Sequence, residues 1–83
     1  MLAFYVFGIT DLQDMYPIIM QAQAKGVDCW VCFFDCFPTK RQFYYYSKDE
    51  LKTLFKNSSV YGHGDESLFT RDYKSKTPEV VFI

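Results

Sequence analysis

Few side chains in this sequence are suited to chemistry, and they stand in short polar segments between apolar ones. His63 is the single histidine of the 83 residues and lies between Gly62 and Gly64. Histidine acts as a general base near neutral pH, but it needs a partner that orients its ring. No partner is adjacent in the sequence, so a ligand-binding histidine and an ordinary exposed loop histidine both stay open.

Three other polar residues follow directly on apolar segments. Thr10 and Asp11 come after the run Leu2–Ile9, and Asp35 comes after the run Val27–Phe34. In open parallel sheets, ligands bind beyond the carboxyl ends of the strands, which is where these residues are expected. Asp11 also suits a helix cap, a purely structural role. The predicted ligand-binding residues are Gly8, Thr10, Asp11, Asp35, His63 and Gly64, and no catalytic residue is assigned.

Cys29 and Cys32 have the CxxC spacing of redox and metal sites. They lie in the apolar run 27–34, however, and a strand sends residues three apart to opposite faces. We therefore expect these two and Cys36 to be buried, reduced thiols. The chain also has no GxxxxGKS or GxxxxGKT loop, no GxGxxG turn and no HExxH helix. We expect no metal site and no cofactor.

The charge balance disfavours polyanion partners. Nine Lys and Arg residues stand against ten Asp and Glu residues, which leaves a formal net charge of −1. Lys40 and Arg41 precede the aromatic segment Phe43–Tyr46, a pattern that single-stranded nucleic-acid binders use. Without a basic field around it, that segment is expected to pack on the sheet, and no nucleic-acid partner is expected.

The apolar N-terminus, residues 1–9, has neither the length of a membrane span nor the basic start and cleavage site of a signal peptide. We expect a cytoplasmic location and no membrane span.

The elements that position these residues follow from hydrophobic patterning. Leu2–Ile9 and Val27–Phe34 are apolar on both alternating faces, as in central strands covered by helices on each side. Between them, Thr10–Gln13 has the pattern of a capping box, and Gly26 suits a helix end. Pro17 allows a helix that begins nearer Asp14, or one that begins at Asp11 and bends. The apolar stripe of this helix is Leu12, Met15, Tyr16, Ile19 and Ala22.

The second half of the chain repeats the alternation. A second capping box, Ser47–Glu50, opens a helix to about residue 57, and Ser58–Tyr61 is a short strand. A third helix opens at Asp65 or Ser67, and Glu79–Ile83 is a final strand. The residues expected to point inward from the last two helices are Leu51, Leu54, Phe55, Leu68, Phe69 and Tyr73.

Strands that alternate with helices predict an α/β fold with a mostly parallel sheet. We expect a Rossmann-like three-layer domain over residues 1–83, with about four strands in the order 3-2-1-4. The first two helices would cover one face and the third the other. One helix is little cover for an apolar face, so we expect an N-terminal piece of a larger protein, or self-association through the apolar sheet face.

Two segments carry a resemblance to a known group of enzymes. FYVFGITDLQDMYPIIMQAQAKGVDCWVCFFD resembles the first β-α-β unit of two-domain glycosyltransferases and glycerophosphotransferases, and KSKTPEVVFI is similar to their later Pro-Glu and Val-Val strand. The resemblance implies an acceptor-side N-terminal domain, inactive alone, whose acceptor is a glycan or polyol phosphate. Gly8 stands alone where the family has a glycine-rich turn, and no histidine opens the first helix.

Two further functions compete with this one. A stand-alone flavodoxin-like or receiver-like module would bind a ligand at the same strand ends, and Asp11 and Asp35 imitate part of a receiver's acidic cluster. A structural interaction domain would instead bury its aromatic sheet face against a partner. Whether the chain belongs to an enzyme stays open.

Overall fold

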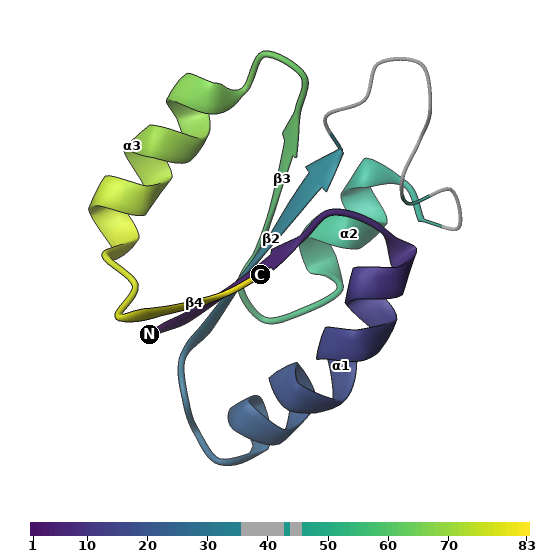
Figure 1. The fold of residues 1–83 in the computed structure, drawn as a ribbon, viewed down its shortest axis with the longest axis vertical. Helices are drawn as coiled ribbons and strands as arrows, with labels where there is room; N and C mark the ends of the chain where they lie inside the picture. Colours follow the sequence, from purple (N-terminus) through teal and green to yellow (C-terminus); the bar gives the residue numbers. More distant parts are fainter. Residues whose placement is uncertain (36–42, 44–45) are drawn as a thin grey trace.

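A computed structural model describes residues 1–35, 43 and 46–83. Figure 1 shows strands and helices in strict alternation along the chain. The elements are β1 (Leu2–Val6), α1 (Ile9–Ala24), β2 (Cys29–Asp35), α2 (Lys48–Thr53), β3 (Ser58–Gly62), α3 (Glu66–Lys76) and β4 (Val80–Phe82). The expected loop 36–42 and its Lys40-Arg41 pair, Cys36, and Tyr44 and Tyr45 lie outside the described residues.

The strands form one parallel sheet in the order β3-β2-β1-β4. In the register, Tyr5 of β1 lies beside Cys32, and Ala3 lies beside Val81 of β4. This confirms the α/β, Rossmann-like class and the order 3-2-1-4. Because β4 pairs on the opposite side of β1 from β2, the direction of winding reverses between β1 and β4.

The helices cover the two faces as expected, with α1 and α2 on one side and α3 on the other (Figure 1). Alternation along each strand divides the apolar side chains between two clusters. The α1 and α2 side holds Phe4, Val6, Leu12, Ile19, Cys29, Val31, Phe33, Phe43, Leu51 and Phe55. The α3 side holds Ala3, Trp30, Cys32 and Tyr61, against which Phe69 packs.

The expected capping box at Thr10–Gln13 is wrong. Helix α1 begins at Ile9, with Gly8 as its N-cap in an extended conformation, and Thr10 lies inside the first turn. The N–H of Leu12 donates to the carbonyl of Gly8 at 3.1 Å, so the first helical bond forms earlier than expected. Asp11, and not Gln13, bonds back to the segment before the helix. Its Oδ2 accepts from the Phe7 N–H at 3.1 Å, and β1 therefore ends at Val6.

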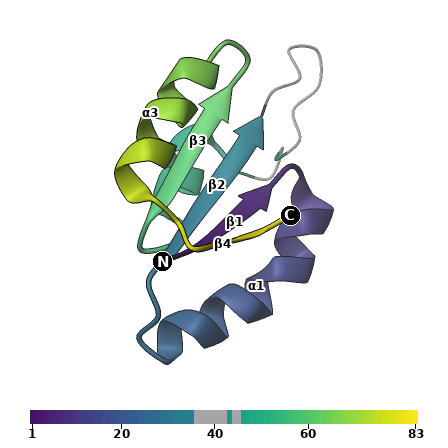
Figure 2. The ribbon, with the colours of Figure 1, turned by 60° about the vertical axis from the view of Figure 1, so that its left-hand side comes forward.

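Pro17 lies inside one continuous helix, α1, and does not open it. The axis of α1 changes direction along its length in Figures 1 and 2, as expected where a proline removes an intrahelical donor. Of the two outcomes, the early start with a bend is the one found, although the helix begins ahead of Asp11. At the other end, the Val27 N–H donates to Ala22 O at 3.0 Å, which delays β2 to Cys29.

The later helices differ from expectation in extent and facing. Helix α2 opens with the expected Ser47–Glu50 capping box but ends at Thr53. The Phe55 N–H is bound by Ser58 Oγ at 3.1 Å and is not part of the helix. In α3, Leu68 and Tyr73 were expected to point inward, yet they are 43% and 41% exposed. The face of α3 toward the sheet instead carries Phe69, Asp72 and Lys76, which contact Trp30 and Tyr61.

Candidate functional site

The carboxyl ends of β1, β2 and β3 meet at one edge of the sheet, here called the rim. Gly8, Thr10 and Asp11 follow β1, and Asp35 ends β2. Asp35 lies in register with Gly62, which ends β3. His63 and Gly64 come next in the chain. The arrowheads in Figure 2 point toward this common edge, so the fold places every predicted ligand-binding residue at the rim.

Acidic side chains at the rim close its loops. Asp11 Oδ2 accepts from the Phe7 N–H, and Asp65 Oδ2 accepts from the Gly62 N–H at 2.7 Å. Each carboxylate sits at a helix start, where it compensates the partial positive charge of the helix N-terminus. An anionic ligand would have to compete with these carboxylates, so the rim suits a neutral ligand better than an anion.

Lys48 is a rim residue that the sequence did not indicate. A methyl group added at Gly62 would lie 3.5 Å from Asp65 Oδ2 and 3.6 Å from Lys48 Nζ. Lys48 opens α2, far from Gly62 in the sequence, and only the packing of α2 beside β3 brings its ammonium group here. The carbonyl of Asp35 is 3.8 Å from the same point, so polar groups of either sign surround Gly62.

Two aromatic rings stack at the rim. Phe7 follows β1 and Phe34 lies near the end of β2, with centroids 5.0 Å apart and planes at 17°. Phe7 is 43% exposed, and the rings of Tyr5 and Phe34 form a T-shaped contact with centroids 5.3 Å apart. The sequence pattern predicted that Phe7 belongs to the first strand. Phe7 lies outside β1 because its N–H donates to the Asp11 carboxylate, and hydrophobic periodicity does not predict this bond.

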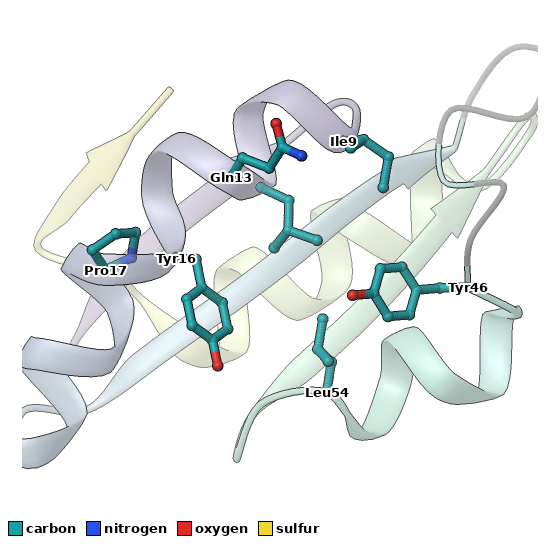
Figure 3. Close-up of a pocket in the computed structure, with 7 residues that line it drawn as sticks. Ile9, Gln13, Tyr16, Pro17, Tyr46 and Leu54 are labelled. Atoms are coloured by element: carbon teal, nitrogen blue, oxygen red, sulfur yellow. The ribbon is translucent and has the colours of Figure 1, made fainter.

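A separate cavity of about 390 Å³ lies between α1 and the α2 region (Figure 3). Its lining is mainly apolar and contains none of the predicted ligand-binding residues. The residues that line it are Ile9, Leu12, Gln13, Tyr16, Pro17, Tyr46 and Leu54. Figure 3 shows the side chains of Tyr46 and Leu54 on one side of this space and those of α1 on the other. A volume of this order suits a small organic molecule.

The side chains with the most strongly shifted pKa values lie between α3 and the sheet, away from the exposed side chains of the rim. Burial raises the pKa of the Cys32 thiol and of the Tyr61 phenol. The Tyr61 hydroxyl donates to Asp72, and this bond lowers the pKa of Asp72. These groups hold α3 on the sheet, so their shifts reflect packing and not a catalytic site.

The two described CxxC cysteines point to opposite faces. Cys29 packs in the α1 and α2 cluster and Cys32 in the α3 cluster, both as free, buried thiols. Among the described residues, no group of three or more His, Cys, Asp and Glu side chains is placed to hold a metal ion. None of the described helices is long and apolar enough to cross a membrane.

Comparison with known proteins adds nothing to this geometry. No family model, curated protein or solved structure matches the chain.

Proposed function

We propose that this chain is an acceptor-binding domain of a group-transfer enzyme, which holds a glycan at the rim and does not catalyse transfer by itself. The observation that carries the proposal is the stacked pair Phe7 and Phe34 at the carboxyl ends of adjacent parallel strands. Ligand sites of open α/β sheets lie beyond these carboxyl ends.

A sugar ring matches the chemistry of the rim. Its C–H face is apolar and packs on an exposed aromatic ring such as Phe7, while its hydroxyl groups need nearby polar partners. Thr10 in the first turn of α1 and His63 in the loop after β3 are both exposed and are suited to that role. The resemblance to glycosyltransferases and glycerophosphotransferases supports the same class of acceptor.

Of the two acceptors that the resemblance implies, the rim favours the glycan over the polyol phosphate. Asp11, Asp35 and Asp65 lie at or just beyond the strand ends, and the ammonium group of Lys48 lies beside Gly62. A phosphate group would be repelled by the carboxylates, whereas sugar hydroxyl groups donate hydrogen bonds to them. Transfer itself requires a donor-binding domain and a catalytic base, and the described rim residues do not assemble such a base.

An NMR titration of the ¹⁵N-labelled chain tests the proposal. We expect neutral disaccharides to shift the amide signals of Phe7, Gly8, Thr10 and His63 with dissociation constants of about 1–50 mM, a range that corresponds to a weak, single-domain site. Glycerol 3-phosphate should give smaller shifts. Phe7→Ala should abolish the shifts, while Tyr16→Ala, a change of an equally exposed aromatic residue in the cavity, should leave them intact.

Either of two results would overturn the proposal. One is the absence of any rim shift with every disaccharide at about 50 mM, since sites weaker than that are not specific. The other is transfer of a sugar from a nucleotide-sugar donor by the chain alone, because the proposal assigns catalysis to another domain.

A second candidate, a stand-alone binding module, is favoured by the cavity between α1 and α2. Tyr16, Tyr46 and Gln13 add hydroxyl and amide groups to its apolar wall, which suits an aromatic alcohol. A titration with 2-naphthol distinguishes the two functions. Shifts confined to Tyr16 and Leu54, lost in Tyr16→Ala but kept in Phe7→Ala, would support the module.

A further inference from the structure

Among the described residues, α3 is the single helix on its side of the sheet (Figure 1), and it is the helix with the least burial. None of its residues is buried, whereas α1 buries Leu12 and Ile19 and α2 buries Leu51. Segments with few buried apolar contacts are the parts of a protein that open at the smallest cost in free energy. We therefore expect α3 to leave the sheet before the other helices do.

Three side chains attach α3 to the sheet. Phe69 stacks on Trp30 with centroids 6.0 Å apart, and it meets Tyr61 edge-on at 5.3 Å. Asp72 accepts the hydrogen bond of the Tyr61 hydroxyl. Lys76 places its ammonium group 5.5 Å from the centre of the Trp30 ring. Asp72 and Lys76 are partly exposed, so water can replace the sheet as their partner when the helix moves away.

The C-terminal end of α3 is strained. Thr77 follows the helix with φ 42° and ψ 60°, the left-handed conformation. This conformation is a true outlier for a β-branched residue, and a residue before a proline, here Pro78, prefers an extended backbone. The Thr77 N–H donates to Tyr73 O at 2.9 Å, so the strained residue is held by the last turn of the helix. Release of α3 would let Thr77 become extended, which removes the strain and lengthens the connection to β4.

The N-terminal end of α3 has a different connection. Asp65 Oδ2 holds the Gly62 N–H at 2.7 Å and keeps this end at the rim. Gly64 between them has φ +90°, and a methyl group added there would meet no atom within 4 Å. Small residues in open loops of this kind absorb the backbone changes of a hinge. The anchored hinge at Gly64 and the strained end at Thr77 favour a movement that starts at the C-terminal end.

We propose that α3 is a strained cover, which detaches from the sheet as one unit while β1, β2, β3, α1 and α2 stay folded. Strained residues of this kind are found at switch regions, where the surrounding structure holds them in place. Detachment uncovers Trp30, Cys32 and Tyr61, all of which are buried while the cover is closed.

The aromatic contacts connect the cover to the rim. Phe69 meets Phe34 edge-on with centroids 5.3 Å apart, and Phe34 stacks on Phe7. When α3 detaches, Phe34 loses the ring that supports it from the helix side. The open state therefore loosens the stacked pair at the rim. The opening itself does not depend on what the rim binds.

Native-state hydrogen exchange of the unmodified chain tests the opening. The amides of residues 70–76 should share one free energy of opening, with protection factors at least about tenfold below that of the Val31 amide. Val31 is the reference because it is buried in β2 and its N–H donates to Asn57 O at 2.9 Å. Protection in α3 equal to that of Val31 would mean that the helix opens only when the whole chain unfolds. Protection that falls gradually toward the helix ends would mean fraying, and either result would overturn the proposal.

Two glycine variants test the strain at Thr77. Thr77→Gly should raise the protection factors of the same amides at least about twofold, because glycine adopts the left-handed conformation without a steric penalty. Ser75→Gly is the matched control, since it places the same residue at an exposed position inside α3. It should lower the protection factors about twofold, because glycine is a poor helix former. Lower protection in both variants would show that Thr77 stores no strain and would refute a strained cover.

Discussion

The hydroxyl of Tyr61 on β3 donates a hydrogen bond of 2.5 Å to the carboxylate of Asp72 on α3. Tyr61 is 4% exposed, whereas Asp72 is partly open to solvent and also binds the exposed Arg71. The bond therefore links the buried sheet to the surface of the single helix on that face.

Removal of the Tyr61 hydroxyl should loosen α3. We expect Tyr61→Phe to lower the free energy of unfolding by about 1.5 kcal/mol, because Asp72 loses a charge-assisted bond while the ring stays packed. Urea unfolding at neutral pH measures the change. Tyr73→Phe is the control, since Tyr73 is 41% exposed, and it should change the free energy by less than about 0.5 kcal/mol. Equal effects of the two variants would mean that the bond contributes nothing.

The buried Cys32 and Tyr61 predict a loss of stability at alkaline pH. The ordinary pKa is about 8.5 for a thiol and about 10 for a phenol. Burial raises the pKa of both side chains above these values in the folded protein. The unfolded chain releases these protons first, so the free energy of unfolding is at its full value below about pH 8 and falls as the pH rises.

Urea unfolding from about pH 7 to pH 11 measures this fall across both ionisations. Tyr61→Phe should make the fall above about pH 10 less steep, while Tyr16→Phe, with an exposed ring, should not alter it. Stability that rises across this range would contradict the burial of the two groups.

Gly26 and Gly62 should respond differently to alanine. Gly26 has φ +78°, with no atom within 4 Å of an added methyl group, so the penalty is conformational alone. We expect Gly26→Ala to lower the free energy of unfolding by about 1 kcal/mol. Gly62 has no such φ, and its nearest neighbours lie at ordinary contact distances, so Gly62→Ala should be neutral or slightly stabilising. Thermal unfolding compares the two, and a reversed order would refute this account of the α1 to β2 turn.

Pro17 interrupts the hydrogen bonding of α1 at an exposed position. Pro17→Ala restores an N–H for the preceding turn and should raise the free energy of unfolding by about 2 kcal/mol. Met20→Ala, at a similarly exposed site on the same helix, should have an effect below about 0.5 kcal/mol. If Pro17→Ala destabilises the chain in denaturant titrations, the bend is needed to pack α1 on the sheet.

The sequence predicted the strand order because its signals were local and strong. Gly26 between two apolar runs marks the end of a helix, and the alternating faces of each run require cover on both sides. The sequence did not predict the start of α1, where several short-range hydrogen bonds compete. Nothing in the sequence pattern distinguished Thr10 from Gly8 as the N-cap residue of α1, since the Asp11 carboxylate suits a helix that starts at either position.

The facing of α3 was misjudged for a related reason. Leu68, Phe69 and Tyr73 all fit an apolar stripe, yet one helix on a twisted sheet contacts it along a narrow line, and Phe69 shares that line with Asp72 and Lys76. Periodicity gives a helix its apolar side but does not give the width of the contact.

The sequence by itself determined the alternation of elements, the parallel order and the rim to which Asp11, Asp35 and His63 belong, because each depends on neighbours in the chain and on general rules of winding. Only the tertiary structure decided that Phe7 stacks on Phe34 and that Lys48 reaches Gly62. These features join segments distant in sequence, and their distances follow from packing, which no local pattern encodes.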